Sequence, residues 1–350
     1  MTDHPFFLRE ALKLATIRKG SCAPNPSVGA VIVREGKIIA TGYHYAPGHA
    51  HAEVEALKKN PDTQDATLYV TLEPCCHFGR TPPCTDAIIK ANIKKVIYGF
   101  KDPNPLVAGK GEAALNKANI DCEFLPIPEI TDFYKSYYYW TETQKPFITA
   151  KIAMTLDGKI ADKNSGPISI TGKELQELTH HCRKQSDAIL TTVKTIICDN
   201  PQMNVRYANE IIAKPLFILD SRLDLPLNAT VCNTAESITL FHSANASYER
   251  KKNLLDRGIH CVEVTENNNK LDLAEIITII GQKNIHDLWI EAGGKCFSEF
   301  LSQKLLHRAL IYIAPKFQGI GIAAFNETEC CPDQVRWQTF GNDILCEMSW

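Results

Sequence analysis

Two short segments of this 350-residue chain can hold a metal ion, and they constrain the fold more than any other feature. The first segment is His51-Ala-Glu53, and the second runs from Pro74-Cys75 to Cys84. A catalytic zinc ion takes three protein ligands and leaves its fourth position to water. One imidazole and two thiolates supply three ligands only if the chain folds so that these segments meet at one point.

Glu53 lies two residues after the histidine and is not needed as a ligand. Zinc lowers the pKa of a bound water molecule toward neutrality, which makes hydroxide available. A nearby carboxylate can take the proton from that water and pass it to a departing amine. A histidine–glutamate pair followed by proline–cysteine is the signature of zinc deaminases. The two segments therefore predict hydrolysis of an exocyclic amine on a pyrimidine-like ring.

The cysteine spacing departs from that signature, in which two residues separate the cysteines. Here eight residues separate Cys75 from Cys84, and Cys84 directly precedes a predicted helix, where a thiolate is stabilised. Cys76 is an alternative ligand, but adjacent cysteines rarely bind one ion with tetrahedral geometry, so we prefer Cys84. His77 could instead close a structural zinc site, although Glu53 would then have no role.

The thirteen cysteines do not suggest a disulfide framework, because the chain is long, their number is odd and no secretory signal precedes them. We therefore expect reduced thiols and a cytoplasmic protein. No apolar run reaches the roughly 18 residues that cross a membrane. The net charge of −2, without blocks of like charge, argues against nucleic-acid binding but is compatible with a small phosphorylated substrate.

The length suits two domains, and two regions alternate strands with helices. The first region has predicted strands at 29–33, 37–40, 66–72 and 95–99 and predicted helices at 1–20, 52–59 and 85–91. The second has predicted strands at 147–153, 188–191, 216–219 and 287–290 and predicted helices at 174–185 and 271–280. A proline-punctuated segment at 123–147, with an aromatic run at 133–140, marks the boundary. We predict an α/β fold with domains at 1–145 and 146–350.

Longer motifs surround the metal-binding segments. They are Pro24-Asn-Pro-Ser-Val-Gly-Ala-Val-Ile-Val33, Thr71-Leu-Glu-Pro-Cys75, Gly79-Arg-Thr-Pro-Pro-Cys84 and Asp102-Pro-Asn-Pro105. Together they closely resemble the bifunctional riboflavin-biosynthesis deaminase–reductases, and the wide cysteine spacing is that family's own form of the motif. The resemblance covers essentially the whole chain and is strongest up to residue 111. It implies a cytidine-deaminase-like N-terminal domain and a dihydrofolate-reductase-like C-terminal domain.

The resemblance also implies two activities. The first is zinc-dependent deamination of 2,5-diamino-6-(ribosylamino)-4(3H)-pyrimidinone 5′-phosphate, and the second is NADPH-dependent reduction of the ribosyl group to ribityl. Beside catalytic Glu53, the deaminase substrate would contact Asn25, His44, Arg80, Asp102 and Asn104, with Arg80 suited to the phosphate. The reductase substrate would contact Arg183, Arg206 and Glu291, with both arginines as candidates for the phosphate. The cofactor would contact Lys151, Asp157, Thr195, Asn200, Gly293 and Gly294.

Each of these binding roles competes with an ordinary structural one. Asn25 and Asn104 stand beside prolines and could be turn residues, and Gly293-Gly294 could be a plain turn. His44, Arg80, Arg183 and Arg206 could simply lie on solvated surfaces.

Two departures from the family pattern concern the reductase half. The family usually has two aspartates where this chain has Asp199-Asn200, and a serine and a tryptophan where it has Pro167 and Ser169. Asparagine keeps hydrogen-bonding capacity but loses a charge, and the lost tryptophan removes an apolar wall. An alternative hypothesis is therefore a deaminase whose C-terminal domain is a non-catalytic scaffold for oligomerisation or docking.

A third hypothesis, a deaminase that edits nucleic acids, predicts a basic surface and the short cysteine spacing, and the sequence has neither. We expect a homo-oligomer that binds a phosphorylated pyrimidine and has no nucleic-acid or membrane partner. Saturable binding of NADPH would separate the bifunctional hypothesis from the scaffold hypothesis.

Overall fold

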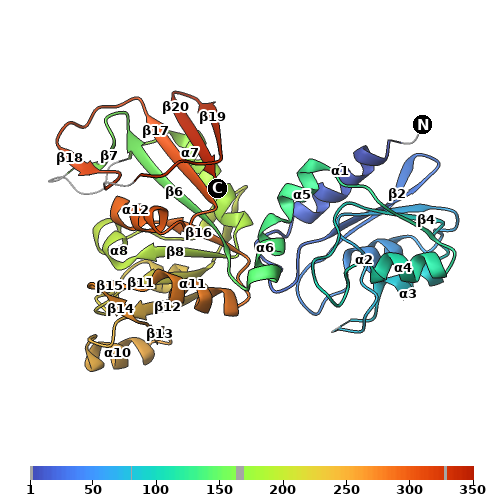
Figure 1. Cartoon of the computed structure of the whole chain (residues 1–350), viewed down its shortest axis with the longest axis horizontal. Helices are drawn as coiled ribbons and strands as arrows, with labels where there is room; N and C mark the ends of the chain where they lie inside the picture. The colour runs from blue at the N-terminus through green and yellow to red at the C-terminus, as the bar shows by residue number, and fades with distance from the viewer. Residues whose placement is uncertain (1–2, 80, 163–168, 327–328) are drawn as a thin grey trace. The chain divides into compact units, whose positions relative to one another are not determined.

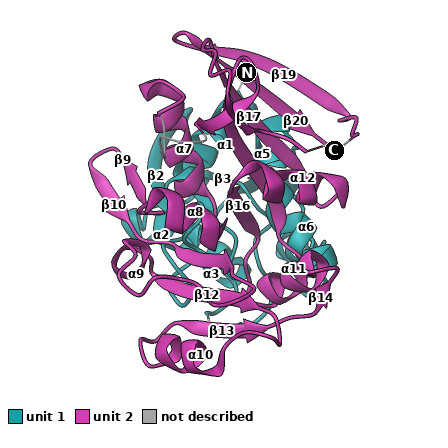
Figure 2. Ribbon diagram, turned by 90° about the vertical axis from the view of Figure 1, so that its left-hand side faces the viewer, with its two compact units in different colours: residues 1–144 teal, residues 145–350 magenta. Residues whose placement is uncertain are grey.

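The computed structural model of the chain describes residues 3–79, 81–162, 169–326 and 329–350. The chain forms two compact units, Met1–Gln144 and Lys145–Trp350, which Figure 2 shows in separate colours. The boundary falls one residue before the boundary expected from the sequence. Within the residues described, no helix combines the length and the apolar character needed to cross a bilayer.

The first unit is built on a sheet that has five strands among the described residues (Figure 1). The strand order is β2-β1-β3-β4-β5, with antiparallel pairing of β1 to β2 and β3 and parallel pairing from β3 to β5. The strands are β1 (Gly29–Arg34), β2 (Lys37–Tyr43), β3 (Thr67–Val70), β4 (Lys95–Tyr98) and β5 (Asp121–Phe124). The helices are α1 (His4–Thr16), α2 (Ala52–Lys59), α3 (Cys84–Lys90), α4 (Lys110–Lys117), α5 (Pro128–Phe133) and α6 (Lys135–Thr143). The helix predicted at 52–59 is confirmed at both ends.

Two glycines bring helices against opposite faces of this sheet. A Cβ atom on Gly29 would lie 2.0 Å from the carbonyl oxygen of Ala11 in α1. A Cβ atom on Gly42 would lie 2.2 Å from the carbonyl oxygen of Ala52 in α2. Gly42 pairs with the residue after Gly29, and neighbouring residues of a strand face opposite sides. The close contact at Gly42 fixes the start of α2, directly after His51.

The proline-punctuated segment expected at the domain boundary belongs largely to the first unit. It contains the end of β5 and the whole of α5 and α6. Tyr134 and Tyr137 are buried in the core of this unit, three residues apart on one helical face. The Tyr134 hydroxyl donates to the carbonyl oxygen of Ser27 at 2.9 Å and lies 2.6 Å from the Thr71 hydroxyl. Tyr134 and Tyr137 therefore form part of the packed core of one unit.

The second unit has a larger sheet, with nine strands over the described part of the chain, in the order β13-β12-β11-β8-β16-β6-β17-β20-β19. Neighbouring strands from β13 to β17 are parallel, and β20 and β19 add an antiparallel pair at one edge. The strands of this sheet are β6 (Phe147–Thr155), β8 (Ala188–Thr192), β11 (Pro215–Leu219), β12 (Ser237–His242), β13 (His260–Glu263), β16 (Asp287–Glu291), β17 (Arg308–Ala314), β19 (Gln334–Phe340) and β20 (Asp343–Ser349). The strands predicted at 147–153, 188–191, 216–219 and 287–290 are confirmed as β6, β8, β11 and β16.

Shorter elements surround this sheet. Three two-stranded sheets are formed by β7 (Lys159–Asp162) with β18 (Gly321–Ala323), β9 (Val205–Tyr207) with β10 (Glu210–Ile212), and β14 (Glu266–Asn267) with β15 (Lys270–Leu271). The helices are α7 (Lys173–Gln185), α8 (Val193–Asp199), α9 (Val231–Thr234), α10 (Tyr248–Leu255), α11 (Leu273–Gln282) and α12 (Gly294–Ser302). The helices predicted at 174–185 and 271–280 are confirmed as α7 and α11.

The central strands of the larger sheet are buried on both faces. Ile189 and Trp289 belong to the core on one face, and Leu190 and Leu288 belong to the core on the other. The strands β8 and β16 are neighbours, so their carboxyl ends lie side by side. Ligands of parallel α/β sheets bind beyond such carboxyl ends. The region beyond the carboxyl ends of β8 and β16 is therefore the expected place for a site in the second unit.

Candidate active sites

The first unit brings the three predicted zinc ligands together. One side-chain donor atom from each of His51, Cys75 and Cys84 lies within 4.8 Å of the other two. The His51 Nδ1 atom is 3.2 Å from the Cys84 Sγ atom and 3.5 Å from the Cys75 Sγ atom. One imidazole nitrogen and two thiol sulfurs match the ligand preference of zinc. No other His, Cys, Asp or Glu among the residues the structure describes joins this group, so the ligand set leaves a position for water.

Neighbouring groups orient the ligands. The His51 Nε2 atom lies 3.3 Å from the Thr81 hydroxyl, and a bond donated to that hydroxyl keeps the Nδ1 lone pair available to a metal. The backbone N–H of Cys84 donates to the Cys75 sulfur at 3.4 Å. A hydrogen bond from the Cys84 thiol, and to a smaller extent one from His51, lowers the pKa of Cys75 to about 4. These contacts favour the thiolate form of one of the two ligand sulfurs.

Replacement of either ligand cysteine is expected to abolish tight zinc binding. The variants Cys75→Ser and Cys84→Ser should bind zinc more than about a hundredfold more weakly, since even loss of an outer-shell partner costs ten- to a hundredfold. Cys76→Ser and His77→Asn are matched controls, because both residues lie outside the cluster, and they should retain one zinc ion per chain. Competition with a chelator and metal analysis measure the affinities. Loss of zinc from Cys76→Ser together with retention by Cys84→Ser would contradict the ligand set.

Glu53 lies in the first turn of α2, immediately beside the cluster, and its side chain is buried. Burial raises the pKa of Glu53 to about 7, with a further rise from the charge of Cys75 that opposes the lowering effect of His51. Glu53 lines a cavity of about 540 Å³ together with His51 and Cys75. A carboxyl group in that position can exchange a proton with a ligand in the cavity.

The same cavity gathers the predicted substrate residues of the first unit that the structure describes, Asn25, His44, Asp102 and Asn104. Arg80 lies outside the described residues. The His44 Nδ1 atom is 3.1 Å from the carbonyl oxygen of Ala50, so Nδ1 carries the proton. Burial lowers the pKa of His44, which keeps the ring neutral. The unprotonated Nε2 atom then accepts from the Asn25 amide at 3.1 Å. This chain of bonds leaves the Asn25 carbonyl oxygen as an acceptor for a ligand.

One wall of this cavity was not predicted from the sequence. Four residues of the segment that follows α5 line it, and they are Tyr137, Trp140, Thr141 and Gln144. The tyrosine and tryptophan lie three residues apart on α6, and this aromatic repeat at helical spacing was the available signal. Their position gives the cavity that contains His51 and Glu53 an aromatic wall.

A second cavity, of about 340 Å³, lies in the second unit. The predicted residues that line it are Lys151, Thr195, Arg183, Glu291 and Gly293. Gly293 precedes α12, and helix N-termini favour anions such as phosphate. Ser169, at one of the two departures from the family pattern, also lines this cavity, whereas Pro167 lies outside the described residues.

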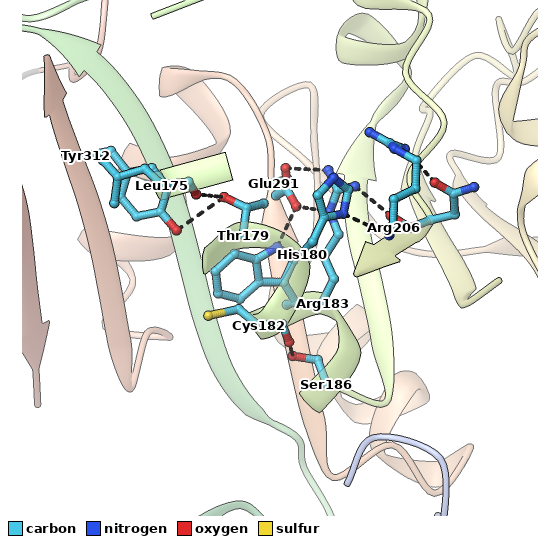
Figure 3. Close-up of polar contacts among 11 residues, drawn as sticks. Leu175, Thr179, His180, Cys182, Arg183, Ser186, Arg206, Glu291 and Tyr312 are labelled. Carbon is cyan, nitrogen blue, oxygen red and sulfur yellow. Dashed lines mark hydrogen bonds and ion pairs between the residues drawn. The ribbon is translucent and has the colours of Figure 1, made fainter. Parts of the chain in front are cut away.

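Arg183 and Glu291, which both line this cavity, form a largely buried ion pair. Figure 3 shows the contacts between the two side chains. The Arg183 Nε and Nη2 atoms donate to the two carboxylate oxygens at 2.5 and 2.9 Å, and Nη1 donates to the carbonyl oxygen of Asn204 at 2.8 Å. Although burial alone would raise it, Arg183 and the nearby Lys151 bring the pKa of Glu291 down to about 2. The donor fork proposed for a substrate phosphate is therefore occupied by the protein's own carboxylate.

Four other predicted residues do not line the second cavity. The Asp157 carboxylate accepts from the backbone N–H groups of Gln318 and Gly319, at 3.0 and 2.7 Å, and links two loops. Arg206 donates to the Asn204 side chain at 2.6 Å. A Cβ atom on Gly294 would lie 2.2 Å from the carbonyl oxygen of Ala324, so Gly294 serves close packing.

Asn200 is the fourth of these residues. It adopts a left-handed conformation with φ of 39°, which asparagine tolerates better than most residues. Its side-chain oxygen accepts from the backbone N–H of Thr230 at 2.8 Å. Its neighbour Asp199 lines the cavity instead, and burial raises the pKa of Asp199. The acidic residue at this cavity is therefore present, one position before the departure noted in the sequence.

Comparison with known proteins gives both units the same relatives. Residues 1–100 match the family model of the cytidine and deoxycytidylate deaminase zinc-binding region, and residues 146–346 match that of the RibD C-terminal domain. The riboflavin biosynthesis protein RibD of Aquifex aeolicus is 39% identical over 323 residues, which are 91% of this chain and 88% of that protein. The Escherichia coli RibD is 34% identical over 329 residues, covering 90% and 88%.

Solved structures of similar proteins match this chain over nearly its whole length. A structure of Acinetobacter baumannii RibD superposes with a TM-score of 0.87 and 34% identity, covering 99% of this chain and 98% of that one. The deaminase/reductase of Thermotoga maritima gives a TM-score of 0.85 and 30% identity with the same coverage. The resemblance inferred from the motifs is confirmed: the chain belongs to the RibD family of riboflavin biosynthesis and is a two-domain enzyme with a deaminase and a reductase activity.

Proposed function

We propose that the first unit deaminates 2,5-diamino-6-(ribosylamino)-4(3H)-pyrimidinone 5′-phosphate and that the second unit reduces the ribosyl group of the product to ribityl with NADPH. The observation that carries the first step is the three-ligand cluster of His51, Cys75 and Cys84 next to buried Glu53 on one cavity. A closed structural site would need a fourth protein ligand there. The deaminated pyrimidine is the substrate that the reductase domain of the same chain would consume.

The residues of the first unit would share the deamination in the following way. A zinc ion on His51, Cys75 and Cys84 supplies an acidified water molecule when it is bound. Glu53 takes the proton of that water and returns it to the exocyclic nitrogen, which leaves as ammonia. The Asn25 carbonyl oxygen, oriented through His44, accepts a hydrogen bond from an N–H group of the ring. The carbon that loses the amine gains the oxygen, so no redox partner is needed.

In the second unit, Lys151, Thr195, Asp199 and Gly293 would hold the nicotinamide cofactor and the sugar between them. NADPH, when it is bound, supplies a hydride to the ribosyl carbon that is bonded to the amino nitrogen. The bond from this carbon to the oxygen of the ribose ring then breaks, and that oxygen needs a proton. Burial lowers the pKa of Lys151, which makes its ammonium a better proton donor. The Arg183–Glu291 pair would hold one positive and one negative charge at fixed positions near Lys151.

The decisive experiment incubates the purified chain with the diaminopyrimidine phosphate, with and without NADPH, and identifies the products by mass. We expect ammonia and the deaminated pyrimidine without NADPH, and the ribityl product with it. Deamination without NADPH oxidation would favour the scaffold hypothesis for the second unit. The same assay with NADH in place of NADPH tests the choice of cofactor.

The contacts of Asn200 and Asp199 predict different outcomes for two single exchanges. Asn200→Asp should leave the rate of reduction within about threefold, because Asn200 contacts a backbone N–H outside the cavity. Asp199→Asn should reduce it about ten- to a hundredfold, which corresponds to the loss of one charged hydrogen bond to a ligand. NADPH oxidation with the deaminated substrate measures both. A large gain from Asn200→Asp would restore the view that the missing aspartate weakens the enzyme.

We also propose that the enzyme is a cytoplasmic homo-oligomer. The ligand thiolates Cys75 and Cys84 must stay reduced to bind zinc, which suits the cytoplasm. Strand β19 lies at the edge of the large sheet, where unpaired backbone groups favour further pairing. Two apolar side chains of β19, Val335 and Trp337, are 43% and 62% exposed. Light scattering over a range of concentrations measures the assembly.

A further inference from the structure

Helix α6 supplies a wall of the deaminase cavity although it follows the last strand of the first unit. The deaminase family model ends at residue 100, so it does not include this helix. Tyr137 is the residue of α6 that connects the wall to a predicted substrate residue. Its ring is buried in the core, and its hydroxyl donates to the Oδ1 atom of Asp102 at 3.0 Å.

Asp102 lines the cavity and is itself buried. Its Oδ1 atom accepts a second hydrogen bond from the backbone N–H of Asn104 at 2.9 Å. Over the described residues, no hydrogen bond engages the Oδ2 atom of this carboxylate. Burial raises the pKa of Asp102 to about 6, and the bonds from Asn104 and Tyr137 oppose that rise and favour the ionised form. One oxygen is held by the protein, and the other is an acceptor without a protein donor.

We infer that Tyr137 is a positioning residue of the deaminase site: its hydroxyl holds Oδ1 of Asp102, so that Oδ2 accepts a hydrogen bond from a hydroxyl or N–H group of a phosphorylated ribosylaminopyrimidine. The inference rests on the proposed deaminase function and names how the site recognises that class of substrate. Tyr137 acts through Asp102 and not on the reacting carbon. Its effect therefore falls on substrate binding more than on the chemical step.

Neighbouring tyrosines provide matched controls for loss of one hydroxyl. Tyr138, the next residue of α6, is 51% exposed, and Tyr138→Phe removes a hydroxyl that makes no contact with Asp102. Tyr134 is buried in the same core, and its hydroxyl bonds Ser27 and Thr71. Tyr134→Phe therefore removes a buried hydrogen bond of the same kind without touching Asp102. It separates a general loss of packing or stability from the loss of Asp102 positioning.

The test measures zinc content, thermal stability, KM and kcat for deamination of the diaminopyrimidine phosphate by the full chain. Tyr137→Phe should raise KM about tenfold, the lower end of what a charged hydrogen bond contributes, and leave kcat within about threefold. Zinc content should equal that of wild type. Tyr138→Phe should change neither parameter, and Tyr134→Phe should lower the melting temperature without the tenfold rise in KM.

A double-mutant cycle with Asp102→Asn decides whether the effect passes through Asp102. In the Asp102→Asn background, the further change Tyr137→Phe should leave KM unchanged. An equal rise in KM in both backgrounds, or a KM for Tyr137→Phe equal to that of Tyr138→Phe, would overturn the inference while leaving the deaminase function intact. If wild type releases no ammonia from this substrate, the proposed function fails, and the inference fails with it.

Discussion

Replacement of Glu53 by glutamine is expected to leave zinc bound and to slow ammonia release by about a hundred- to ten-thousandfold, the usual contribution of a positioned proton-transfer group. Glutamine has nearly the same shape and can still form hydrogen bonds, but it cannot carry the proton from water to the leaving amine. Glu53 is buried beside the ligand cluster, so bulk water cannot readily replace it. The loss should therefore appear in kcat.

The matched control is Glu55→Gln on the same helix. Glu55 pairs at the surface with Lys58 at 3.0 Å and lies outside the cavity, so this variant should keep the wild-type rate. Ammonia release and metal content measure both variants. A Glu53→Gln enzyme that retains zinc and more than about a tenth of wild-type turnover would count against the proton-transfer role.

The deaminase site was largely predictable because its signals are local. His51 and Glu53 sit at the start of α2, and Cys84 is the first residue of α3, so residue type and helix position together gave their roles. The contribution of α6 was not predictable in this way. Tyr137 and Asp102 are separated by 35 positions in the sequence, and only the packing of α6 on the core brings them together. A proline-punctuated aromatic segment indicates a boundary, but it does not tell which side its residues pack against.

The reductase site was harder to predict because neighbouring residues in a turn face different ways. The departure from the family pattern falls on Asn200, yet Asp199 lines the cavity and Asn200 caps the helix end. The ion pair of Arg183 with Glu291 joins residues 108 positions apart, from α7 and β16. Each looks like a substrate ligand in the sequence, because a charged residue alone does not reveal its partner.

The edge of the large sheet was also missed. Strand β19 is exposed along nearly all of its length, so it lacks the alternation of buried and exposed residues that marks a strand. Its register with β20 follows from pairing across the sheet, from Gln334 with Ser349 to Phe340 with Asp343. The β19–β20 hairpin joins the sheet through β20, which pairs with β17 on its other side, and a short sequence window around β19 does not contain β17.

The substitution Arg183→Met is expected to destabilise the second unit by about 3–5 kcal/mol, the usual effect of removing one partner of a buried ion pair. The Glu291 carboxyl group would stay largely buried without its bidentate partner, and the charge and hydrogen bonds of Arg183 that lower its pKa would be lost. The cavity with Lys151 would lose the fixed charges around it, and reduction should fall steeply. Deamination should persist, because the first unit has its own core and its own cavity.

Two further variants test whether the loss of stability comes from the unpaired Glu291 carboxyl group. Lys184→Met, at the next residue, breaks a partly exposed pair with Glu210 at 2.7 Å and a cation–π contact with Tyr207, and it should cost about 1 kcal/mol. In the double variant Arg183→Met/Glu291→Gln the unpaired carboxylate is gone, so stability should recover relative to Arg183→Met while reduction stays low. Chemical denaturation followed by the two activities measures each variant. If Arg183→Met unfolds at the wild-type denaturant concentration, the ion pair does not stabilise the second unit, and Arg183 becomes available again as a ligand for the substrate phosphate.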